Sequence, residues 1–182
     1  MTVVIEVVQP ALEETAVEAL YREHHPRIVA LLARIVGDRQ QAEDIAADVF
    51  CKLSQRPAAI GGCDNPTAWV YRVATNAGLD ALRKHGRRRL REEQAGVEIL
   101  RRAAPSDALQ TVLAAERQAC VRAVLAGLKP RDAQLLLLRS SGLAYREIAQ
   151  AMGIALPSVG TLLARAEAEF ERKYRARYGD AI

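Results

Sequence analysis

The sequence predicts an all-α protein, and three observations support this fold class. Hydrophobic residues make up 50% of the 182 residues but aromatic residues only 4%, so alanine, leucine and valine dominate, a composition that suits helices. Apolar residues recur at helical spacing, as in Ile28, Leu31, Leu32 and Ile35. No pair of strand-like segments, internal repeat or glycine-rich phosphate loop occurs. The length suffices for one medium domain or two small ones.

Capping residues predict where the helices of the first half begin and end. Pro26 either starts the first apolar stripe or kinks the helix before it. Asp38 is the predicted N-cap of the next helix. Asn65 and Pro66 are a favourable N-cap and first residue for the helix after that, and we expect Gly86 to end it.

These two helices also carry distinctive polar residues. Glu43, Asp44 and Asp48 form a small acidic patch, with the two aspartates one turn apart. The patch is either a solvated helix face or a docking surface for a basic partner. The later helix has a polar side made of Arg72, Asn76, Asp80 and Arg83. Its end passes into a basic stretch containing Lys84, Arg87, Arg88, Arg89 and Arg91, which is either solvated or neutralises phosphates.

A stretch in the second half has the layout of a helix-turn-helix. Ile148 and Val159 are apolar where such a unit buries side chains, and Ala149 is small where its helices cross. Gly153 stands at the turn, where a left-handed backbone is needed. Pro157 follows near the start of the second helix, which in such units enters the DNA major groove.

Composition argues against several other classes of protein. The net charge of +4 permits a nucleic-acid partner. The three cysteines are an odd number, without a C-x-x-C spacing, so we expect no disulfide framework and a cytoplasmic location. We expect no metal site, no cofactor and no catalytic activity, because the sequence has no group of metal-ligating or catalytic residues at a suitable spacing. We also expect no signal peptide and no membrane insertion.

Two blocks of the sequence resemble one known family. AEDIAADVFCKL followed by NPTAWVYRVATNAGLDALR is similar to region two of the bacterial sigma factors of the extracytoplasmic-function class. LKPRDAQLLLLRSSGLAYREIAQAMGIALPSVGTLLARA is similar to region four of that class. The order and spacing of the blocks also agree, and the resemblance extends over about residues 11–174.

The resemblance implies an alternative sigma factor that binds core RNA polymerase and directs promoter-specific transcription initiation. It implies a region-two helical bundle at residues 11–90, a flexible linker at 91–107 and a region-four helix-turn-helix domain at 108–178. The implied partners are the clamp helices and flap of the polymerase, promoter DNA and an anti-sigma factor, with no small-molecule substrate. The protein is expected in the cytoplasm, beside the polymerase on the nucleoid.

The resemblance also assigns expected roles to residues. Polymerase binding is expected from Glu43, Asp44 and Asp48. Minus-ten DNA is expected to meet Arg72, Asn76, Asp80, Arg83, Lys84, Arg87, Arg88 and Arg89. Minus-thirty-five DNA is expected to meet Arg146, Ser158, Thr161 and Arg165. Of the aromatics near the melting site, Trp69 is expected in the core, which leaves Tyr71.

The recognition helix departs from the family pattern, because Gly160, Leu162 and Ala164 stand where more basic and polar residues are usual. Two other interpretations therefore stay open. A stand-alone helix-turn-helix regulator would bind duplex DNA without polymerase. A sigma-like interaction protein would bind polymerase or a regulator yet support no transcription.

Overall fold

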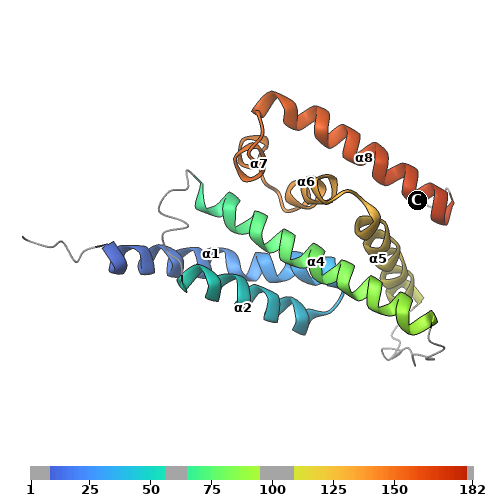
Figure 1. Ribbon diagram of the computed structural model, residues 1–182, viewed down its shortest axis with the longest axis horizontal. Helices are drawn as coiled ribbons and strands as arrows, with labels where there is room; N and C mark the ends of the chain where they lie inside the picture. The colour runs from blue at the N-terminus through green and yellow to red at the C-terminus, as the bar shows by residue number, and fades with distance from the viewer. Residues whose placement is uncertain (1–8, 56–64, 95–108, 180–182) are drawn as a thin grey trace, which may run out of the picture.

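The computed structural model describes residues 9–55, 65–94 and 109–179, and within these ranges it contains helices and no strand. The prediction of an all-α protein is confirmed. In chain order the helices are α1 (Gln9–Val36), α2 (Arg39–Gln55), α4 (Pro66–Gln94), α5 (Leu109–Gly127), α6 (Pro130–Ser140), α7 (Tyr145–Met152) and α8 (Leu156–Tyr178). Figure 1 shows α4 between α1 and α2 on one side and α6 and α7 on the other.

Helices α1, α2 and α4 form the first unit, a bundle with an apolar centre. Ile28, Leu32 and Ile35 of α1 are fully buried, as is Val70 of α4. The two predicted N-caps, Asp38 and Asn65, are confirmed. The side chain of each accepts a hydrogen bond from a backbone N–H in the first turn of its helix. The Asp38 carboxylate accepts from the N–H of Gln41 at 2.7 Å, and the Asn65 side-chain oxygen accepts from the N–H of Ala68 at 3.0 Å.

One glycine brings α1 and α4 close together. A Cβ placed on Gly78 would lie 2.8 Å from a terminal methyl of Leu32 and 3.3 Å from one of Ile35. Both neighbours are fully buried, so an added Cβ would have to displace packed side chains. Gly78 therefore favours the close approach of the two helices.

Helices α5 to α8 form the second unit, which contains the predicted helix-turn-helix. Gly153 follows α7 with a left-handed backbone (φ 63°), and the N–H of Ile154 bonds to the carbonyl of Ala149 at 3.0 Å. Ile148 and Val159 are fully buried between the helices. This arrangement confirms the motif, with α8 as its second helix.

The two units share one continuous apolar core. Leu135 and Leu138 of α6 are fully buried and belong to the same cluster of contacting side chains as Val70 and Leu79 of α4. Because α4 is covered on two sides, Thr75 is also fully buried, although it is polar.

Three local expectations need correction or refinement. Gly86 does not end α4, which continues to Gln94. The helix therefore extends into residues 91–94, which were predicted to belong to the linker. A Cβ at Gly86 would meet nothing within 4 Å, so no close contact requires a glycine there. The remainder of the expected linker, residues 95–108, lies outside the described residues. Pro26 does not start a helix, because α1 runs through it. Trp69 is only half-buried at the edge of the core, whereas Tyr71 is buried.

Candidate nucleic-acid and protein interfaces

The acidic patch lies on the exposed side of α2. The opposite side is buried through Ala42, Ala46, Val49, Phe50 and Leu53, so helical periodicity turns Asp44 and Asp48 toward solvent. Both are exposed and form no ion pair within the described ranges. Glu43 is half-exposed and accepts from Arg39 at 3.0 Å. Among the residues that the structure describes, the patch thus presents two unpaired carboxylates beside one paired carboxylate, a surface suited to a basic partner.

The residues expected to form one polar side of α4 are divided in the structure. Asn76 and Asp80 are exposed, whereas Arg72 and Arg83 are half-buried against the second unit. Arg72 donates from Nη1 to the carbonyl oxygen of Ala151 in α7 at 3.0 Å. Arg83 donates from Nη2 to the carbonyl oxygen of Leu128, just after α5, at 3.4 Å. In this arrangement the two arginines hold the units together and are not presented jointly with Asn76 and Asp80.

Further polar contacts cross the same seam between α4 and the second unit. Gln134 of α6 is 7% exposed and donates its amide to the carbonyl of Arg72 at 3.1 Å and to the hydroxyl of Thr75 at 3.4 Å. Asn65 donates to the side-chain oxygen of Gln150 at 3.0 Å. Buried polar groups need such partners, so Gln134 is satisfied here through the docked arrangement.

Sequence reasoning missed this seam, although α4 carries a signal for it. Its apolar and small residues cover more than one side of the helix: Val70, Tyr71, Val73, Ala74, Ala77, Gly78 and Leu79. A surface helix with one buried face needs a narrower stripe. The wide arc therefore indicates a second packing partner, without saying which segment supplies it.

The two aromatic residues of α4 are buried to different degrees. Tyr71 is 3% exposed and its ring meets the His24 ring edge-on at 5.8 Å. Burial raises the pKa of the Tyr71 hydroxyl, while neighbouring Arg27 acts in the opposite direction. Trp69 is half-buried.

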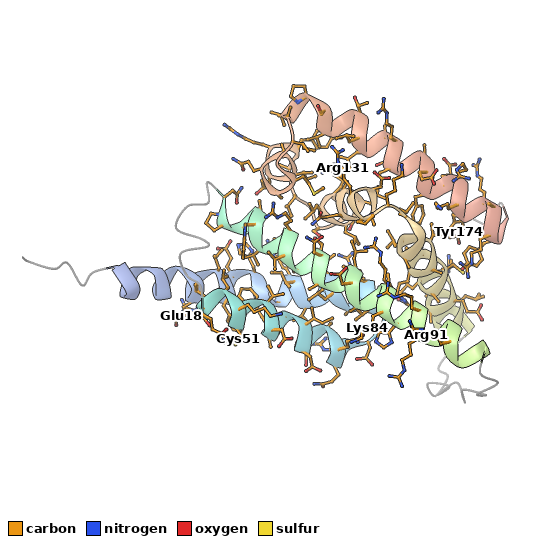
Figure 2. All side chains as sticks on the ribbon, viewed as in Figure 1. Glu18, Cys51, Lys84, Arg91, Arg131 and Tyr174 are labelled. Atoms are coloured by element: carbon orange, nitrogen blue, oxygen red, sulfur yellow. The ribbon has the colours of Figure 1, made fainter. Side chains whose placement is uncertain are left out.

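The basic stretch continues α4 beyond the packed part of the bundle. Lys84, Arg87, Arg88 and Arg91 are exposed, and Figure 2 shows Lys84 and Arg91 toward the free end of the helix. The backbone of Arg89 belongs to the same helix, and its side chain lies outside the described set. Successive cations on a projecting helix form a surface suited to phosphates.

The recognition helix α8 has one buried and one open side. Val159, Leu163 and Ala166 are buried against the rest of the unit. Ser158, Thr161 and Arg165 are exposed and line one shallow hollow of about 490 Å³. Arg146 of α7 is also exposed but lies outside the lining of this hollow. The structure therefore brings together three of the four residues expected to meet minus-thirty-five DNA.

Two family models match the two units. Sigma-70 region 2 matches residues 20–88 and Sigma-70 region 4 matches residues 118–170, which together cover more than half of the chain. The chain belongs to the sigma-70 family of RNA polymerase sigma factors, in the extracytoplasmic-function class. It is an alternative sigma factor that directs transcription initiation, and sigma factors act by binding RNA polymerase and promoter DNA.

Two similar proteins are also RNA polymerase sigma factors. The chain is 28% identical over 160 residues to RNA polymerase sigma factor YlaC of Bacillus subtilis, covering 86% of this chain and 91% of that protein. It is 26% identical to the ECF sigma factor SigE of Mycolicibacterium smegmatis, covering 88% of this chain and 62% of that longer protein.

A solved structure shares the fold. It is the sigma factor RpoE in complex with the anti-sigma factor NepR from Bartonella quintana, with a TM-score of 0.53 and 19% identity, covering 87% of this sigma factor and 96% of that chain. Among the described helices, none alone is both long enough and apolar enough to cross a membrane; α7 and α8 reach that threshold only when counted together across their bend.

Proposed function

We propose that this sigma factor binds the clamp helices of core RNA polymerase through the acidic patch and reads minus-thirty-five DNA through the open side of α8. The observation that carries the proposal is the two-sided character of α8. Its apolar side is buried, while Ser158, Thr161 and Arg165 line an unobstructed hollow. A second helix of a helix-turn-helix needs such an open polar side to enter the major groove.

The minus-ten surface is proposed on α4, from Asn76 and Asp80 through the basic stretch. Arg72 and Arg83 join it only when the second unit moves away, because both are bonded to that unit in the present arrangement. Binding to polymerase and promoter therefore selects an open arrangement of the two units, provided the polymerase binds that arrangement more tightly. The protein acts in the cytoplasm, beside the polymerase on the nucleoid, and catalyses no reaction itself.

Run-off transcription tests the function. Purified core polymerase is combined with the full chain on a library of genomic fragments, and core polymerase alone serves as the control. We expect transcripts that start at a limited set of promoters sharing two conserved elements. A gel shift with the chain alone distinguishes the competing interpretation, since a stand-alone regulator would bind its site without polymerase. Polymerase binding without any promoter-specific transcript would support a sigma-like interaction protein instead.

We further propose that an anti-sigma protein inserts apolar side chains between the two units. A hollow of about 390 Å³ there has a largely apolar lining that includes Leu31, Val121, Leu125 and Phe170, and Val121 is 38% exposed. The sigma factor RpoE, which has a similar fold, was solved in complex with the anti-sigma factor NepR, and this supports a partner of that class. After co-purification identifies a partner, the complex is rebuilt from purified components with Val121→Glu. We expect the variant to lose the complex, and a complex of unchanged affinity would exclude this hollow.

A further inference from the structure

The beginning of α8 exposes no side chain of the types that identify guanine, adenine or cytosine. Residues 156–164 read LPSVGTLLA, without arginine, lysine, asparagine, glutamine, aspartate or glutamate. Arginine and lysine pair with guanine in the major groove, asparagine and glutamine with adenine, and the two acids with cytosine. Ser158 and Thr161 are exposed, but a hydroxyl both donates and accepts, so it does not select one base. Base selection by this part of α8 therefore depends on another kind of contact.

Apolar groups take part in the lining of the hollow on this helix. Four of the residues that line it are apolar: Ile154, Ala155, Pro157 and Leu162. Thr161 lines it too, and its side chain carries a methyl group beside the hydroxyl. Figure 2 shows where the hollow lies, because Arg131, labelled between α6 and α8, belongs to the same lining. The surface that faces the hollow thus offers methyl groups as well as hydroxyl groups.

Helical spacing directs Thr161 and Leu162 toward this hollow. Val159, Leu163 and Ala166 are buried against the rest of the unit, which fixes the rotation of α8 about its own axis. Thr161 is exposed and Leu162 is half-buried, and both line the hollow. In a helix-turn-helix unit, residues near the N-terminal end of the second helix contact the edges of bases. Thr161 and Leu162 therefore stand where their methyl groups can meet a base.

We propose that Thr161 and Leu162 select thymine in the minus-thirty-five duplex by contact with its 5-methyl group. Thymine is the base that presents a methyl group in the major groove, and apolar side chains and the methyl group of threonine recognise it by contact. The proposal rests on the minus-thirty-five surface proposed above and names the base that this surface prefers. The upstream promoter element is therefore expected to contain thymine where it faces these two residues.

The size of the effect follows from the burial of one methyl group. Removing an apolar group of this size from water is worth about 0.8 kcal/mol, which corresponds to about a fourfold change in affinity. Deoxyuridine isolates this contribution, because it pairs as thymidine does but its base lacks the 5-methyl group.

Holoenzyme made from core polymerase and the full chain is bound to a promoter recovered by run-off transcription. A nuclease footprint locates the upstream contact, and duplexes are prepared with deoxyuridine in place of each thymidine there, one at a time. We expect about fourfold weaker binding to at least one of these duplexes. Unchanged affinity for all of them, or an upstream contact made only of G·C pairs, would overturn the proposal.

Two variants show whether the named side chains make the contact. Thr161→Ser removes a methyl group from an exposed residue and keeps the hydroxyl, and Leu162→Ala shortens the half-buried side chain. For each variant we compare the affinity for the thymidine duplex with that for the deoxyuridine duplex, a ratio that a general loss of binding does not change. We expect at least one variant to lose the preference for thymidine. If both keep it, the preference reflects the shape of the DNA and the proposal is overturned.

Leu156→Ala is the matched control. Leu156 is 49% exposed at the start of the same helix, but it does not line the hollow. We expect this variant to keep the preference of the parent protein for thymidine. Loss of the preference in Leu156→Ala as well would mean that it does not depend on the hollow, and would overturn the proposal.

Arg165→Ala separates the proposal from the function on which it rests. If Arg165→Ala weakens promoter binding and deoxyuridine has no effect, the thymine contact is wrong and the minus-thirty-five surface stands. If the holoenzyme leaves the upstream DNA unprotected and Arg165→Ala binds the promoter as the parent does, both the contact and the proposed surface are wrong.

Discussion

Arg72, in the helix of region two that we assign to minus-ten DNA, donates a hydrogen bond of 3.0 Å to the carbonyl oxygen of Ala151, in the first helix of the helix-turn-helix. A single guanidinium thus links the two units. The same side chain cannot hold Ala151 and also follow a DNA strand. The docked arrangement therefore conceals part of the proposed minus-ten surface but leaves the open side of α8 accessible.

The seam between the units should open when Gln134 is changed to glutamate. The substitution keeps the size of the side chain but removes the amide that donates to Arg72 and Thr75. It also places a charge at a site that is 7% exposed, which is costly. We expect a larger radius of gyration in small-angle scattering and a loss of about 1–3 kcal/mol in the free energy of unfolding in urea.

Gln150→Glu is the matched control for that change. Gln150 is exposed and accepts from Asn65 through its side-chain oxygen, and glutamate keeps an accepting oxygen. We expect this variant to keep the dimensions and stability of the parent protein. If Gln134→Glu also keeps them, the docked arrangement does not depend on the buried amide.

The acidic patch should be needed for polymerase binding but not for stability. Asp44→Lys combined with Asp48→Lys reverses two exposed charges that have no ion-pair partner among the described residues. We expect weaker capture of core polymerase, with a thermal unfolding transition close to that of the parent, since such surface changes stay within about 0.5 kcal/mol. Glu116→Lys with Glu167→Lys gives the same charge change on exposed positions of the second unit. Equal capture by both double variants would mean that the patch is merely solvated.

The basic stretch should contribute to the salt dependence of promoter binding by the holoenzyme. Changing Arg87, Arg88 and Arg89 to alanine removes three cations from the end of α4. If all three contact single-stranded phosphates, the slope of log K against log salt falls by about 2, at about 0.7 for each contact. The slope is measured on a promoter recovered by run-off transcription. An unaltered slope would argue against phosphate contacts by this stretch.

Two glycines of α4 should respond to alanine in opposite directions. At Gly78 the new methyl group would overlap buried Leu32 and Ile35, and overpacking costs about 1–3 kcal/mol. Alanine is the better helix former by about 1 kcal/mol, so we expect a net loss of about 1 kcal/mol in the free energy of unfolding.

At Gly86 a Cβ meets nothing within 4 Å, so only the gain in helix propensity applies. We expect Gly86→Ala to stabilise the protein by up to about 1 kcal/mol, measured by the same denaturation in urea. A destabilised Gly86→Ala would show that α4 does not continue through this position. A stabilised Gly78→Ala would contradict the close approach of α1 and α4.

Local features of this protein followed from the sequence because neighbouring residues produce them. Asp38 and Asn65 cap their helices with their own side chains, and Gly153 adopts the left-handed backbone that the turn requires. These effects act within one helical turn, so spacing along the chain was enough to predict them. The predicted end of α4 was wrong. Gly86 lowers helix propensity by only about 1 kcal/mol, and this local cost is too small to end a long helix.

Contacts between distant segments were decided only by the tertiary structure. Gln134 meets Arg72 and Thr75 across 62 and 59 residues of sequence, and Arg131 reaches the hollow on α8 from a helix before the motif. The hydrophobic effect is non-directional. The wide apolar surface of α4 therefore indicates that a second segment packs on it, but not which segment. Only the folded arrangement shows which segment covers α4, and therefore which of its arginines are half-buried and which are exposed.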